Sequence, residues 1–101
     1  MLSSLLALAM AMQSDTTRAS REAFTRCLRQ VVESSVQARK TAEQFQAEYA
    51  QACMTEQAAF REAMIRRDMA MRSTRASAQE SADMEVEDAR TNLAGLFEPP
   101  R

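Results

Sequence analysis

The chain has 101 residues, of which 46% are apolar and 27% are charged, and it contains one glycine and two prolines. This length and composition fit one small soluble helical domain, and they exclude glycine-rich phosphate loops, collagen-like repeats and disordered segments. The absence of histidine removes the commonest general base and metal ligand, and a formal net charge of −1 argues against nucleic-acid binding.

Residues 1–11 predict an export signal, followed by a single helical domain over residues 12–101. The run Met1–Met12 carries no charge, is too short to cross a bilayer, and has the length of a signal-peptide apolar region. Ala9 and Ala11 supply the small residues of a cleavage site, so we expect a periplasmic or secreted protein without a stable membrane span. In the alternative interpretation, this segment is an apolar helix that packs on the domain through Leu2, Leu5, Leu6, Ala9 and Met12.

An amphipathic helix is predicted from Arg18 to Ala38, because apolar residues recur there at spacings of three and four. These residues are Ala23, Phe24, Cys27, Leu28, Val31 and Val32. The pattern breaks over residues 39–41, and Thr41 followed by Gln44 is a capping-box signature for the start of the next helix.

A long second helix is predicted to follow Thr41 and to reach Arg72, because its apolar positions advance by four and three residues in turn. The stripe consists of Ala42, Gln46, Tyr49, Cys53, Glu56 or Gln57, Phe60, Met64 and Met71, widened by Phe45 and Ala63. This helix would be the longest element of the domain and its central one.

Ser73 and Thr74 are candidate N-caps for a third helix, which ends at Gly95 ahead of two consecutive prolines. Its apolar stripe is Ala78, Ala82, Val86, Ala89, Leu93 and Leu96 or Phe97. No segment shows the apolar alternation of a strand. The sequence therefore predicts an all-α fold, in which an antiparallel helical hairpin with a long central helix is joined by a third helix.

Cys27 and Cys53 each lie thirteen residues from Lys40, the midpoint of the predicted turn. In an antiparallel hairpin they would face each other, so we expect a disulfide, which would stabilise the fold by roughly 3 to 4 kcal/mol. A disulfide fits an oxidising compartment, whereas the alternative is two buried thiols in a cytosolic bundle. We expect neither thiol chemistry nor a metal site, because reactive pairs are usually close in sequence. Tetrahedral zinc needs four ligands, and two cysteines without histidine are too few unless carboxylates or a second chain contribute.

Charge alternates in blocks: +3 over Asp15–Lys40, −3 over Thr41–Phe60, +3 over Arg61–Arg75 and −5 over Ala76–Glu98. Opposite signs meet if the first helix packs on the first half of the second helix and the third helix packs on its second half. The second basic block is also a candidate surface for an anionic partner, although most such runs are only solvated helix faces. Its arginines are Arg61, Arg66, Arg67, Arg72 and Arg75.

Glu56 falls in the predicted apolar stripe, between Cys53 and Phe60. A buried carboxylate needs a partner, and Arg21 of the first helix is the candidate. The alternative is a side chain at the edge of the stripe that reaches solvent.

The methionines have two interpretations besides filling the core. Met54, Met69 and Met84 lie beside the stripes and predict an adaptable apolar surface for varied partners. Met64 and Met71, seven residues apart, raise the alternative of a periplasmic Cu(I)-binding protein.

We expect a small exported protein without enzymatic activity or cofactor, which acts as a protein-interaction, chaperone-like or structural module or by self-association.

Overall fold

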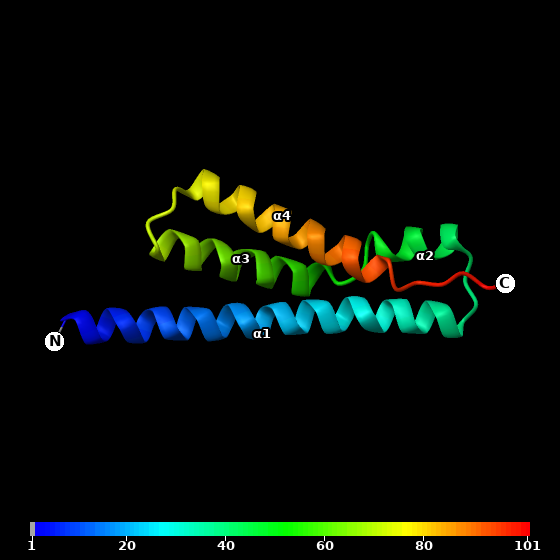
Figure 1. Cartoon of the computed structure of the whole chain (residues 1–101), viewed down its shortest axis with the longest axis horizontal. Coiled ribbons are helices and arrows are strands. Elements are labelled where there is room, and N and C mark those ends of the chain that lie inside the picture. The colour runs from blue at the N-terminus through cyan, green and yellow to red at the C-terminus, as the bar shows by residue number, and fades with distance from the viewer. Residues whose placement is uncertain (1) are drawn as a thin grey trace.

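The computed structural model describes the backbone from Leu2 onward and the side chains from Asp15 onward. Four helices and no strand are present in the described backbone (Figure 1). They are α1 (Leu2–Gln37), α2 (Ala42–Tyr49), α3 (Met54–Ala70) and α4 (Arg75–Ala94). The all-α prediction is confirmed. The two interpretations of residues 1–11 concern side chains that lie outside the described residues.

The helix α1 runs along one side of the molecule, and the chain then returns along it through α2 and α3 (Figure 1). The helix α4 folds back along α3, and it contacts α1 as well. The predicted first helix, apart from Ala38, therefore lies within α1, and it packs on both halves of the returning chain.

The first turn has the local geometry that the sequence predicts. Arg39 is left-handed, with φ 56°, and the amides of Arg39 and Lys40 bind the carbonyls of Val36 and Ser35 in a Schellman pattern. The capping box is present, because the Thr41 side chain accepts from the Gln44 amide while the Gln44 side chain accepts from the Thr41 amide.

The prediction of one long central helix is wrong, because α2 ends at Tyr49 and α3 begins only at Met54. The chain turns between them, and Cys53 adopts a left-handed conformation with φ 63° that an α-helix cannot contain. No proline or glycine marks this turn, and the apolar stripe continues across it. For that reason the hydrophobic period could not reveal the break.

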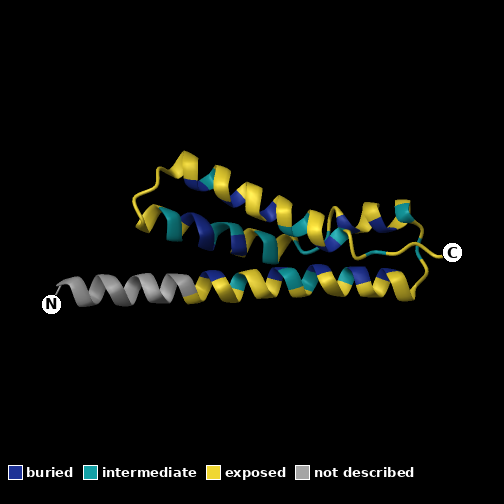
Figure 2. Ribbon diagram, viewed as in Figure 1, coloured by how far each residue is buried: buried dark blue, intermediate teal, exposed yellow. Residues whose placement is uncertain are grey.

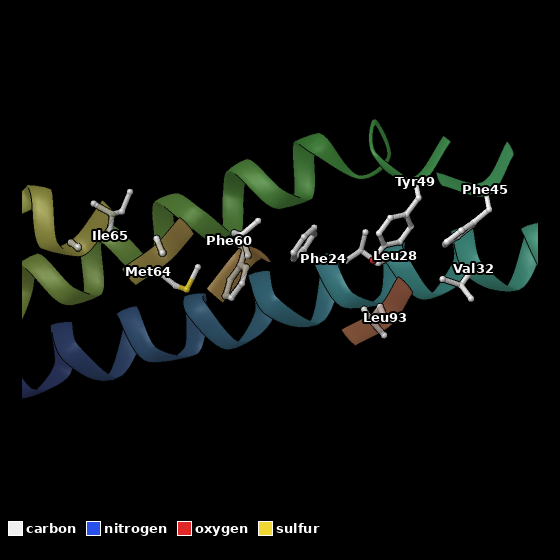
Figure 3. Close-up of a cluster of buried hydrophobic side chains, with 12 residues drawn as sticks. Phe24, Leu28, Val32, Phe45, Tyr49, Phe60, Met64, Ile65 and Leu93 are labelled. Carbon is white, nitrogen blue, oxygen red and sulfur yellow. The ribbon is translucent and has the colours of Figure 1, made fainter. Parts of the chain in front are cut away.

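The core lies between α1 and the three later helices (Figures 2 and 3). Phe24 and Phe60 meet near its centre with ring centroids 5.8 Å apart, and Phe45 stacks on Phe97 at 4.1 Å. The larger buried apolar side chains are Phe24, Leu28, Val32, Phe45, Tyr49, Phe60, Met64, Ile65, Val86 and Leu93. Burial of these side chains is the main stabilising contribution to the fold.

Four predicted stripe positions are corrected by the structure. The first is Gln46, which is exposed on α2. Ala23 is exposed on α1, Met71 is 65% exposed in the turn after α3, and Leu96 is 56% exposed, so that Phe97 is the residue that packs. Ile65 is buried although it lies off the predicted stripe. The reason is that α3 contacts both α1 and α4, so its buried face is wider than one stripe.

The third helix begins as predicted, because Thr74 is the N-cap of α4 and its side chain accepts from the Ser77 amide. In the turn before it, Arg72 is left-handed with φ 70°. The amides of Arg72 and Ser73 bind the carbonyls of Met69 and Asp68, which forms a second Schellman pattern.

Replacing Arg72 with glycine is expected to stabilise the protein by about 1 kcal/mol, because glycine adopts positive φ without the steric cost that an L side chain carries. Urea unfolding followed by far-UV circular dichroism measures the change. The matched control is Arg66→Gly inside α3, which should destabilise the protein by about 1 kcal/mol. A destabilising effect of Arg72→Gly would contradict this account of the turn.

Candidate functional site

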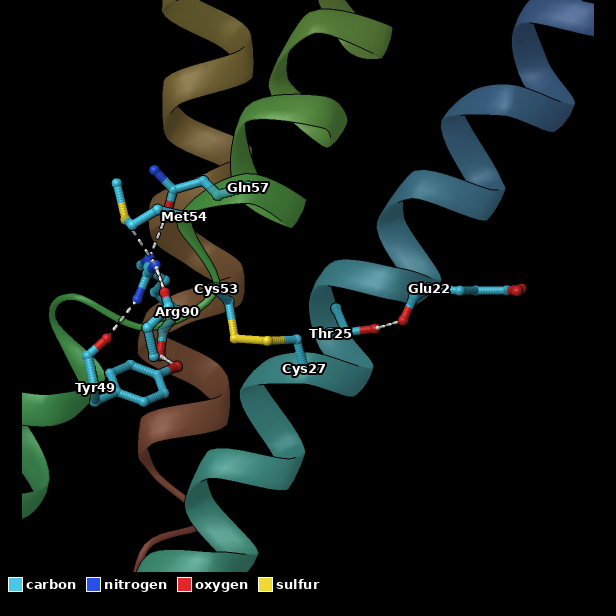
Figure 4. Close-up of a disulfide and its surroundings, with 9 residues drawn as sticks. Glu22, Thr25, Cys27, Tyr49, Cys53, Met54, Gln57 and Arg90 are labelled. Carbon is cyan, nitrogen blue, oxygen red and sulfur yellow. Dashed lines mark hydrogen bonds between the residues drawn. A yellow bond between two sulfur atoms is a disulfide. The ribbon is translucent and has the colours of Figure 1, made fainter.

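The cysteine pair joins α1 to the turn between α2 and α3. The Sγ atoms of Cys27 and Cys53 lie 2.00 Å apart, which is disulfide distance, and their Cα atoms lie 5.9 Å apart (Figure 4). The predicted facing of the two cysteines is confirmed. Cys53, however, is the residue that precedes α3 and not a position within a long helix.

Arg90 of α4 holds the same turn from the other side (Figure 4). Its Nη1 donates to the Tyr49 carbonyl at 2.8 Å, its Nη2 donates to the Ala52 carbonyl at 2.5 Å, and its Nε donates to Gln57 Oε1 at 2.5 Å. The guanidinium therefore satisfies carbonyls that the end of α2 leaves without helical partners. Sequence reasoning missed this residue, and the only signal was a lone base within an acidic block.

Aromatic rings enclose this guanidinium. Its carbon lies 5.6 Å from the ring centroid of Phe24 and 5.5 Å from that of Tyr49. The Tyr49 hydroxyl donates to the Arg90 carbonyl at 2.6 Å, so the two residues bind each other reciprocally. Burial raises the pKa of the Tyr49 phenol above its ordinary value, against the opposing effects of the Arg90 charge and a backbone contact at Ala94.

Ion pairs join the charge blocks of opposite sign. Arg21 of α1 lies 3.5 Å from Glu85 of α4, Arg61 of α3 lies 2.7 Å from Asp83 of α4, and Lys40 pairs with Glu48 of α2. The predicted contacts of opposite blocks are present, and α1 with α4 adds one that the sequence did not predict. These pairs are largely exposed, so they favour this arrangement more than they add stability.

The five arginines of the candidate anionic surface do not form one patch of unpaired charge. Arg61 faces Asp83, Arg66 lies 3.8 Å from Glu62, and Arg67 lies 3.2 Å from Asp68. The hydrogen bond to Asp83 raises the pKa of Arg61. The other two members, Arg72 and Arg75, are exposed at the turn between α3 and α4.

The sequence offered Arg21 as a partner for Glu56 in one of two interpretations, and the structure does not show that pair. Arg21 pairs with Glu85 instead, and its guanidinium carbon lies 5.2 Å from the ring centroid of Phe60. Glu56 is half-buried in the first turn of α3, and its carboxylate lies close to the sulfur atoms of Cys27 and Cys53.

The methionines separate into one core residue and an exposed group. Met64 is buried, so it and the exposed Met71 do not share the core stripe that the Cu(I) interpretation assumed. The exposed methionines are Met54, Met69, Met71 and Met84, at 41% to 65% exposure. Of these, Met54 and Met69 stand near opposite ends of α3, roughly 22 Å apart along its axis.

The described surface carries open grooves. The groove between α1 and α4 has a volume of about 470 Å³, with Arg21 and Arg29 on one wall and Glu85 and Asp88 on the other. A second groove, of about 460 Å³, lies between α1 and α3.

No described helix has a stretch that is both long and apolar enough to cross a membrane.

The Arg90 contacts lead to a stability prediction. Arg90→Lys should destabilise the protein by about 2 to 4 kcal/mol, because an ammonium group cannot reproduce the fork that binds Tyr49, Ala52 and Gln57. Urea unfolding of the oxidised protein measures the loss. The matched control is Arg29→Lys. Arg29 is an exposed residue of α1, so this substitution should change the free energy of unfolding by less than about 0.5 kcal/mol. Equal effects of the two substitutions would contradict the role given to Arg90.

Comparisons with known proteins add no relative to this description. No protein-family model, no curated protein and no solved structure matches the chain. A function is therefore argued from the residues of the chain itself.

Proposed function

We propose that this chain is a small extracytoplasmic binding module without enzymatic activity, which holds exposed apolar segments of other proteins. The observation that carries the proposal is the group of four exposed methionines, Met54, Met69, Met71 and Met84. All four belong to α3, to α4 or to the turn between them, where they are spread along the length of α3, and we call this set the methionine surface.

Methionine suits such a surface because its side chain is unbranched, flexible and polarisable, and so it adapts to partners of different shape. Two of the four side chains contact arginines of α4: Met54 Sδ lies 3.5 Å from Arg90, and Met69 Sδ lies 3.9 Å from Arg75. An apolar and a cationic side chain thus lie side by side at both places. This combination fits unfolded segments that carry both apolar and acidic residues.

The open grooves also favour binding over catalysis. A small-molecule site usually encloses most of its ligand, whereas the groove between α1 and α4 is open to solvent and has charged side chains of both signs in its lining. Extended contacts with a macromolecule suit such a surface.

Export is the second part of the proposal. Two cysteines at disulfide distance favour an oxidising compartment, where such a bond persists, and the apolar run at residues 1–11 fits a signal segment. A periplasmic or secreted location would bring the module to proteins that emerge unfolded from the export machinery.

The binding proposal predicts that the oxidised protein suppresses light scattering by heat-denatured citrate synthase, used without reductant. Replacement of all four residues of the methionine surface by glutamine should abolish the suppression and leave the far-UV circular dichroism unchanged. The matched control replaces Val36 and Leu96 by glutamine as well. These two are exposed apolar residues outside this surface. Its suppression should equal that of the natural sequence.

Two results would contradict the proposal: no suppression by the natural sequence, or equal loss in the control variant. Sedimentation velocity across a concentration series tests self-association as the alternative use of the same surface. Dimers that disappear in the methionine variant, without any suppression of scattering, would favour self-association.

The export proposal predicts the intact mass of untagged protein recovered from fractionated cells. Loss of residues 1–11 and of two hydrogen atoms is expected in the extracytoplasmic fraction, because cleavage follows Ala11 and the pair is oxidised. A full-length chain with both thiols reduced, found in the cytosolic fraction, would contradict it.

A further inference from the structure

One oxygen of the Glu56 carboxylate and the Sγ atoms of Cys27 and Cys53 lie within 4.8 Å of one another. Glu56 follows Cys53 by three residues in the first turn of α3, so the two side chains share one side of that turn. Cys27 faces them from α1. All three residues are half-buried, and no other such group of metal-binding side chains occurs among the described residues.

We propose that, when the cysteine pair is reduced, these three side chains bind a thiophilic divalent cation, with Zn²⁺ as the best fit. The inference does not depend on the methionine surface. The cysteine pair would then have two mutually exclusive states, a disulfide and a metal site.

The chemistry of the donor atoms supports Zn²⁺. Two thiolates and one carboxylate are ligands that zinc accepts, and three protein ligands with water in the fourth position form an open tetrahedral site. Zn–S bonds of about 2.3 Å and Zn–O bonds of about 2.1 Å place tetrahedral ligand atoms roughly 3.6 to 3.8 Å apart. The observed cluster lies within reach of that spacing once the S–S bond is broken.

Electrostatics point the same way. Once the sulfur atoms are thiolates, this small volume holds three negative charges, which repel one another in a half-buried setting. A divalent cation reduces the net charge from −3 to −1. The cluster therefore favours a bound cation in the reduced protein, and the disulfide removes two of the three ligands in the oxidised protein.

A dithiol reductant supplies two electrons and two protons, the S–S bond breaks to give two thiols, and the reductant becomes a disulfide. Zn²⁺ then displaces both thiol protons to solvent and forms two Zn–S bonds and one Zn–O bond.

The test uses the full chain, reduced with a water-soluble phosphine that ends as its oxide, and freed of it by gel filtration without oxygen. Co²⁺ is titrated as a spectroscopic probe, and Zn²⁺ is then added in competition. We expect a thiolate-to-Co²⁺ charge-transfer band and the visible bands of a tetrahedral site, both removed by Zn²⁺. The oxidised protein should give neither.

Glu56→Gln separates a three-ligand site from binding by the thiolates alone. Removal of a residue that only hydrogen-bonds to a metal ligand typically weakens metal binding by roughly 10- to 100-fold. Loss of the ligand itself should weaken Co²⁺ binding by at least as much. Glu62→Gln is the matched control, because Glu62 lies on the same helix and is also half-buried. Its binding should equal that of the natural sequence.

The proposal is overturned if the reduced protein gives no Co²⁺ bands, or if Glu56→Gln binds as tightly as the natural sequence. Binding of Cu(I) alone, without Zn²⁺, would also overturn it. If reduction unfolds the chain, Zn²⁺ should restore the far-UV circular dichroism of the natural sequence and not that of Glu56→Gln. Failure to restore it would count against the site.

Discussion

The turn between α2 and α3 is the constraint on which the rest of the structure depends. It contains a residue in a left-handed conformation, and the carbonyls of Tyr49 and Ala52 do not accept the amide four residues further on, as they would within a helix. Arg90 binds those carbonyls from α4, while Cys27 holds Cys53 from α1. Two helices that are distant in sequence, α1 and α4, therefore meet at the four residues of irregular chain between α2 and α3. The cost of the strained backbone is offset because both contacts also join helices to one another.

Local signals in the sequence predicted much of this fold. The capping box at Thr41, the N-cap at Thr74 and the facing of Cys27 and Cys53 depend on neighbouring residues or on simple helical arithmetic, so a sequence alone reveals them. The break after Tyr49 could not be predicted in this way. Its stabilising partner, Arg90, lies in another helix, and the segment itself contains no helix-breaking residue.

The candidate sites were predictable to different degrees. Exposure of Met54, Met69 and Met84 follows from their positions beside the stripes, and the structure confirms it. The pairing of Arg61 with Asp83 depends on how α3 and α4 align, which no local pattern fixes. Glu56 was an anomaly in an apolar stripe, but its nearness to both sulfur atoms arises only from the turn that moves Cys53 off the helix.

The position of the cysteine pair has a consequence for the order of folding. The chain has only two cysteines, so an intramolecular disulfide has a single possible pairing and needs no isomerisation. Both cysteines belong to the first 53 residues and precede α4 along the chain, so a chain that enters an oxidising compartment from its N-terminus delivers both of them before α4. Covalent closure of the first hairpin can thus precede the arrival of Arg90, and the last helix then locks a loop whose ends are already joined.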